Sequence, residues 1–121
     1  MTPHRLGYWL KTLVAEVVPI DEHLFVNYQG LSVEELERKV ATYASPQEAQ
    51  QWMNVVLLDD FISEICGDDW EDADAVEIVE IVAVAWGYQV RSKYPQAAFR
   101  TESVSDRETG DLGLRLIGTL C

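Results

Sequence analysis

Apolar side chains near the N-terminus recur at helical spacing. This pattern is typical of an amphipathic helix, and its apolar positions are Leu6, Trp9, Leu10, Leu13 and Val17. Thr2 and Pro3 suit the cap and the first turn of such a helix, where proline's missing N–H is harmless. Pro19 is expected to end the helix, because the residue before a proline avoids the helical region.

Residues 32–44 indicate a second helix. It begins with a capping box, in which the Ser32 hydroxyl accepts a bond from a free backbone amide and Glu35 reaches back to the cap. The apolar face of this helix carries Leu36, Val40 and Tyr43. Between the first two helices, the run Leu24–Tyr28 fits either a short strand or a turn of helix.

The clearest helix start in the sequence lies at Ser45. Ser45 and Glu48 form a second capping box, with Pro46 at the first helical position. This third helix is expected to continue to about Cys66, because Gly67 then suits a left-handed stop. Its predicted apolar stripe comprises Ala49, Trp52, Met53, Val56, Leu57, Phe61 and Ile65.

The segment Ala75–Trp86 is almost entirely apolar. Glu77 and Glu80 alone interrupt it, and their three-residue spacing favours a helix with a narrow wet edge that is buried on most sides. Its many β-branched residues leave a buried strand as the alternative. We expect a helix because the segment is long for a strand, and we expect it to fade between Gly87 and Pro95.

The last quarter of the chain alternates like a β-hairpin. Phe99–Ser105 and Leu112–Ile117 alternate in polarity around a turn composition at residues 106–111. A lone hairpin is marginal in water, and residues 24–28 are the only candidate for a third strand. The expected fold is therefore mainly α with a C-terminal β-hairpin (α+β). We expect about four helices packed in one small domain spanning residues 1–121.

Acidic residues are concentrated in the middle of the chain. The protein has 21 acids and nine bases, a formal net charge of −12, and eleven of the acids fall within residues 46–95. No Lys or Arg occurs between Val40 and Val90. Such a run is either a solvated face or a surface for a basic protein. It argues against direct binding to nucleic acid or to anionic membranes, both of which require basic contacts.

The acids that would meet a basic partner lie late in the third helix and in the connector after it. Trp70 lies among them, and it either folds back onto the core or serves as an aromatic anchor ringed by acids. The predicted partner-binding residues are Asp59, Asp60, Glu64, Asp68, Asp69, Trp70, Glu71, Asp72 and Asp74.

These features predict a small acidic protein-binding module rather than an enzyme. In composition alone, it is comparable with immunity-type inhibitors, whose acids replace the phosphates that a nucleic-acid-acting protein expects. One alternative is a small-ligand or divalent-cation-dependent carboxylate enzyme that uses Asp60 and Glu64. Another is a structural homo-oligomer whose apolar helix faces pair with each other.

Motifs for catalysis, cofactors and export are missing. The sequence has no Gly-x-Ser-x-Gly elbow and no phosphate-cradling glycine loop, and the acidic connector lacks the central glycine of a calcium loop. We therefore expect no catalytic residue, no cofactor and no metal site. Lys11 and Glu16 interrupt any signal-peptide core, and Cys66 and Cys121 form no disulfide framework. A cytoplasmic protein without a membrane span is expected.

Overall fold

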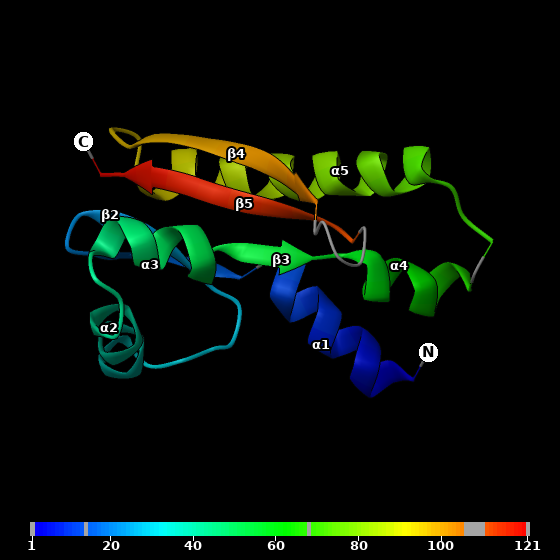
Figure 1. The fold of residues 1–121 in the computed structure, drawn as a ribbon, viewed down its shortest axis with the longest axis horizontal. Helices are drawn as coiled ribbons and strands as arrows, with labels where there is room; N and C mark the ends of the chain where they lie inside the picture. The colour runs from blue at the N-terminus through cyan, green and yellow to red at the C-terminus, as the bar shows by residue number, and fades with distance from the viewer. Residues whose placement is uncertain (1, 14, 68, 106–110, 121) are drawn as a thin grey trace.

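The computed structural model describes residues 2–13, 15–67, 69–105 and 111–120, which form five helices and five strands (Figure 1). The helices are α1 (Pro3–Leu13), α2 (Val33–Ala41), α3 (Pro46–Met53), α4 (Asp59–Cys66) and α5 (Asp72–Lys93). The strands are β1 (Glu16–Ile20), β2 (His23–Asn27), β3 (Val55–Leu57), β4 (Ala98–Ser105) and β5 (Leu112–Thr119).

An antiparallel sheet forms the centre of the fold. β4 pairs with one edge of β5 along its whole length. The other edge of β5 pairs with β3, where Val55 lies opposite Arg115, and with β2, where His23 lies opposite Thr119. β1 completes the sheet as the partner of β2. The prediction of a mainly α fold with a single C-terminal hairpin is therefore wrong, because strands from three parts of the chain combine in one sheet.

The predicted C-terminal hairpin itself is confirmed as β4 and β5. Residues 106–110 of its expected turn lie outside the described part of the chain. The Leu24–Tyr28 segment lies largely in β2, so the strand interpretation of that segment is confirmed. Its place differs from a simple third strand of the hairpin, since β2 pairs mainly with β1 and meets β5 at a single residue pair.

The first predicted helix is too long. α1 ends at Leu13, and Glu16–Ile20 is β1, which turns back into β2 through Asp21 and Glu22 at positive φ. Pro19 lies inside β1 rather than after a helix. Proline is tolerated there because β1 is an edge strand of the sheet, where no inner neighbour requires its N–H. The helical spacing of the apolar residues gave a wrong prediction here, because the β-branched residues of β1 pair with β2 as a strand.

The predicted helix over residues 45–66 is interrupted by a strand. α3 ends at Met53, β3 occupies Val55–Leu57, and α4 starts at Asp59. The helical spacing of the apolar residues misled the prediction, because Val56 and Leu57 pair with β5 instead of continuing a helix face. The Ser45 side chain accepts a hydrogen bond from the Glu48 N–H, as expected. The Glu48 carboxylate, however, accepts from the Ala44 N–H at 3.1 Å instead of from the N–H of Ser45.

Two apolar cores lie on the two faces of the sheet. α5 covers one face, and its buried Val79, Val82, Trp86 and Val90 pack against alternate residues of the strands. α2 and α3 cover the β1–β2 end of the other face, where Phe25 is fully buried. The helix prediction for Ala75–Trp86 is confirmed, but the expectation that it is buried on most sides is wrong.

Two amide side chains of the α3 segment join β2 to β5 where the strands diverge. Asn54 Nδ2 donates to the carbonyl oxygens of Leu24 at 2.8 Å and Leu116 at 3.0 Å. Asn54 Oδ1 accepts from Val26 N–H at 2.9 Å. One turn earlier, Gln50 Nε2 donates to Leu24 O at 2.8 Å. Both residues are buried, so they act as a polar bridge inside the sheet.

Candidate protein-binding surface

The predicted partner-binding acids do not form one uniform patch, because two of them, Asp59 and Glu64, bond to distant parts of the chain. Asp59 is half-buried at the start of α4, and its Oδ1 accepts from Leu112 N–H at 2.7 Å. Burial raises the pKa of Asp59, and the bond from Leu112 offsets part of that rise. Asp59 therefore ties α4 to the start of β5.

Glu64 is the second acid that bonds to a distant part of the chain. Its carboxylate accepts from Arg5 Nε at 2.9 and 3.2 Å and from Trp9 Nε1 at 3.4 Å. The hydrogen bond from Arg5 is the main cause of a lowered pKa at Glu64. Trp9 also stacks at a tilt on Phe61, with ring centroids 5.4 Å apart. Glu64 therefore anchors α1 on α4.

Trp70 packs toward the protein interior. It is half-buried against the core on the α5 face of the sheet, and its Nε1 donates to Ser63 Oγ at 3.3 Å. Of the two alternatives that the sequence left open, folding back onto the core matches this position. A role for the remaining exposed part of the indole in binding stays a prediction.

Exposed carboxylates remain near the junction of α4 and α5. Asp60 is exposed in the first turn of α4, and Asp69, Glu71 and Asp74 are exposed around the start of α5. Glu71 and Asp74 also form a capping box, in which Glu71 N–H donates to Asp74 Oδ2 at 3.0 Å. Asp68 and the side chain of Asp72 lie outside the described part of the structure.

The outer face of α5 carries apolar side chains that sequence reasoning missed. Ile81, Val84 and Tyr88 are 61%, 71% and 73% exposed, respectively. Glu77 and Glu80 lie on the same side of the helix and are also exposed. The signal was present in the sequence, because a residue four positions after an exposed glutamate shares its helix face. That rule places Ile81 and Val84 in water.

Acidic and apolar side chains form one continuous strip along this helix. We call it the α5 surface, and define it as Asp74, Glu77, Glu80, Ile81, Val84 and Tyr88. Carboxylates occupy its N-terminal half, and the apolar side chains occupy its centre. At its C-terminal end, Arg91 lies over the Phe99 ring, with 5.3 Å from its guanidinium carbon to the ring centroid. Contiguous exposed apolar residues with a polar rim are typical of interaction sites.

The alternative of a carboxylate metal enzyme gains no support from geometry. Asp60 is exposed, and Glu64 is held by Arg5. Among the residues that the structure describes, no three His, Cys, Asp or Glu side chains are grouped so that they could hold a metal ion. In the same described residues, no helix is both long enough and apolar enough to cross a membrane.

Comparison of the chain with protein-family models, with curated proteins and with solved structures gives no significant match.

Proposed function

We propose that the protein is a small acidic protein-binding module whose α5 surface docks on a basic protein. The observation that carries this proposal is the exposure of Ile81, Val84 and Tyr88 in line with the carboxylates of the same helix. Interfaces commonly combine an apolar centre with a charged rim that steers the partner. The acids of the α4–α5 junction extend this rim toward the N-terminal end of α5.

Energetics favour a basic partner over a purely apolar one. Full burial of a large apolar side chain contributes ~1.5–3 kcal/mol, so burial of the exposed parts of Ile81, Val84 and Tyr88 would contribute roughly 3–6 kcal/mol. Association costs ~4–15 kcal/mol in lost translational and rotational freedom. The apolar centre of the α5 surface is therefore too small on its own. Ion pairs with a basic partner would add the missing affinity and speed the encounter.

The same charge argument supports an antagonist of a nucleic-acid-acting protein. Such a protein presents Lys and Arg side chains arranged for phosphates. A row of carboxylates along one helix, such as Asp74, Glu77 and Glu80, could occupy that surface and keep nucleic acid away from it. This finer role rests on the formal net charge of −12 and on the placement of the acids.

The experiment is an affinity capture at low and at high salt with matched variants. Ile81→Ser removes apolar area from the α5 surface, and Val33→Ser removes it from α2, where Val33 is 53% exposed. Glu77→Lys with Glu80→Lys reverses charge on α5. Glu34→Lys with Glu37→Lys makes the same net change on α2, where both residues are exposed. Cytochrome c serves as a generic basic protein.

Support would be a captured basic protein that is lost with both α5 variants, kept with both α2 variants and released by high salt. The purified partner should then associate with this protein ~10–100-fold more slowly at high salt, because the ions screen the electrostatic attraction that steers the encounter. Equal capture by α5 and α2 variants would refute the assignment of the α5 surface. If cytochrome c binds as tightly as the captured protein, net charge alone explains the binding, and the specific role of the α5 surface is refuted.

Self-association is the second candidate, and the charge order along α5 favours it. The helix has acids at Asp74 and Glu77 and bases at Arg91 and Lys93 in its last turn. In an antiparallel pair of two copies, Asp74 would face Arg91 of the second copy when Ile81 faces Val84. Sedimentation tests this: Arg91→Asp should yield monomers, and adding Asp74→Arg should restore the dimer. Monomeric wild type over the whole concentration range would exclude it.

A further inference from the structure

A groove on the opposite face of the sheet from α5 has a different chemistry. It lies between α2, the end of β2 and the C-terminal end of α3, and it has a volume of about 420 Å³. Leu36 and Met53 contribute apolar side chains, and Tyr28, Tyr43 and Trp52 contribute aromatic rings. Ligand pockets commonly enclose ~300–1,000 Å³. The size of this groove therefore suits a small organic molecule of one or two rings.

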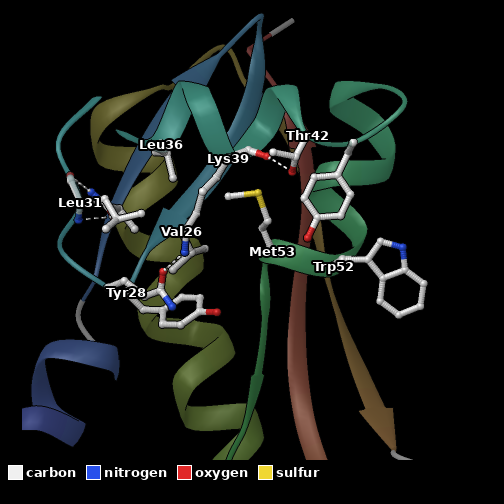
Figure 2. A pocket seen from close by; sticks show the side chains of 11 residues that line it. Val26, Tyr28, Leu31, Leu36, Lys39, Thr42, Trp52 and Met53 are labelled. Atoms are coloured by element: carbon white, nitrogen blue, oxygen red, sulfur yellow. Dashed lines mark hydrogen bonds between the residues drawn. The ribbon is translucent and has the colours of Figure 1, made fainter. Parts of the chain in front are cut away.

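The groove contrasts in charge with the rest of this acidic chain. Among the described residues that line it, none is acidic, and Lys39 carries the one charged side chain. Figure 2 shows Lys39 reaching from α2 toward Tyr28, with Met53 beside it. Gln29 Oε1 accepts from Lys39 Nζ at 2.7 Å, which holds the ammonium at this place. A cation is therefore positioned at the mouth of an apolar groove.

An acid one turn away on α2 is engaged mainly in the helix cap. Glu35 lies one turn before Lys39, and its carboxylate accepts from Ser32 N–H at 3.3 Å as part of the helix cap. The Glu35 amide N–H also donates to the Ser32 hydroxyl at 3.2 Å, so the cap holds this residue near the start of α2. The charge of Lys39 contributes only the smallest part of the lowered pKa of Glu35. Lys39 is exposed, so its remaining N–H donors can reach a ligand.

We infer that this groove binds a small aromatic anion. Its ring would lie among Tyr28, Met53 and Trp52, where offset stacking and sulfur contacts favour aromatic over aliphatic bodies. Its carboxylate or sulfonate would accept from Lys39 Nζ. Trp52 is 61% exposed at the rim, and Figure 2 shows its indole pointing away from Lys39, so a change of rotamer would be needed for it to close over a bound ring. This site is separate from the α5 surface, since no residue of α5 is among the described residues that line the groove.

The test compares two probes with the same rings and different charge. Anilinonaphthalene sulfonate is an anion, and phenylnaphthylamine has the same aromatic skeleton without the sulfonate. Binding is followed by probe fluorescence and by quenching of Trp52, with Trp52→Phe as the control that locates the signal. Lys39→Met removes the ammonium but keeps the length of the side chain. Arg38→Met makes the same charge change on α2 outside the groove.

Wild type should bind the anion more tightly than the neutral probe. Lys39→Met should lower the affinity for the anion about fivefold, which is the upper end for an exposed ion pair. The affinity for the neutral probe should stay within about twofold. Arg38→Met should change the affinity for neither probe. Gln29→Glu should lower the affinity for the anion although Lys39 is still present, because the new carboxylate neutralises the ammonium.

An equal loss of affinity for the anion with Lys39→Met and with Arg38→Met would overturn the inference, because the net charge of the protein alone would then explain the binding. Loss of probe binding with Ile81→Ser, together with unchanged binding in Lys39→Met, would place the probe on the α5 surface and also overturn it. Tighter binding of octanoate than of indole acetate would reject the aromatic class. None of these outcomes depends on whether a basic protein partner is found.

Discussion

Substitution of Asn54 by alanine should destabilise the protein strongly, although this residue touches no candidate site. Its amide makes three buried hydrogen bonds, to Leu24 O, Leu116 O and Val26 N–H. Alanine fits the backbone at this position but can make none of them. Leu24 O would keep the bond from Gln50, whereas the Val26 N–H would lose its acceptor.

The magnitude follows from these bonds. An orphaned buried N–H costs ~1–3 kcal/mol, and each of the two other lost bonds costs ~0.5–1.5 kcal/mol, so we expect a loss of roughly 2–6 kcal/mol in the free energy of unfolding. A domain of this length is stable by on the order of 6–18 kcal/mol. The melting temperature should fall by roughly 10–20 °C.

Urea unfolding followed by circular dichroism measures this loss. Gln47→Ala removes an exposed amide from the same helix and should change stability by less than ~0.5 kcal/mol. Asn54→Asp keeps the shape but loses both donors, so it should be at least as unstable at neutral pH. It should partly recover in acid, where the protonated carboxyl regains one donor. A loss in Asn54→Ala no larger than in Gln47→Ala would refute the bridging role.

Three further outcomes are expected. Gly113→Ala should destabilise by about 1–3 kcal/mol because its Cβ would meet the backbone of β3, while Gly7→Ala in the open helix α1 should be neutral or stabilising, as urea midpoints can show. Glu64→Gln should lower the melting temperature at neutral pH. The difference in melting temperature from wild type should vanish in acid, because a carboxylate with a lowered pKa stabilises the fold only while it is ionised. Once wild-type Glu64 is protonated, Arg5 loses its anionic partner in that protein too. Asp59→Asn should show the opposite sign, since the raised pKa means that ionisation opposes folding: its melting temperature should equal or exceed wild type at neutral pH and converge with it in acid. A pH-independent difference in either carboxylate variant would contradict these assignments.

Features with short-range causes could be predicted from sequence. The capping box of Ser32 and Glu35 forms as expected, because both of its bonds close within one turn. The β4–β5 hairpin formed because its alternation and its turn composition lie within about twenty residues of each other. The helix over Ala75–Trp86 could be predicted because this apolar segment is longer than a typical buried strand.

The candidate surfaces were predictable only in part. The concentration of acids near the α4–α5 junction is a property of composition, and the structure keeps Asp60, Asp69, Glu71 and Asp74 exposed there. The engagement of Glu64 by Arg5 could not be foreseen, since 59 residues separate them in the chain. The groove beside Lys39 combines residues of α2, β2 and α3, and no local pattern marks it.

By itself, the sequence determined the caps, the hairpin, the long helix and the segregation of charge, because each depends on residues that are neighbours along the chain. Tertiary structure alone decided that Val55–Leu57 is a strand, since those residues gain hydrogen-bond partners only where β5 presents its free edge. The glutamates of α5 mark the side that faces water, but tertiary structure decided how much apolar area stays exposed beside them. An apolar helix can bury only one side on a sheet, so Ile81, Val84 and Tyr88, on the side of α5 turned away from the sheet, stay exposed.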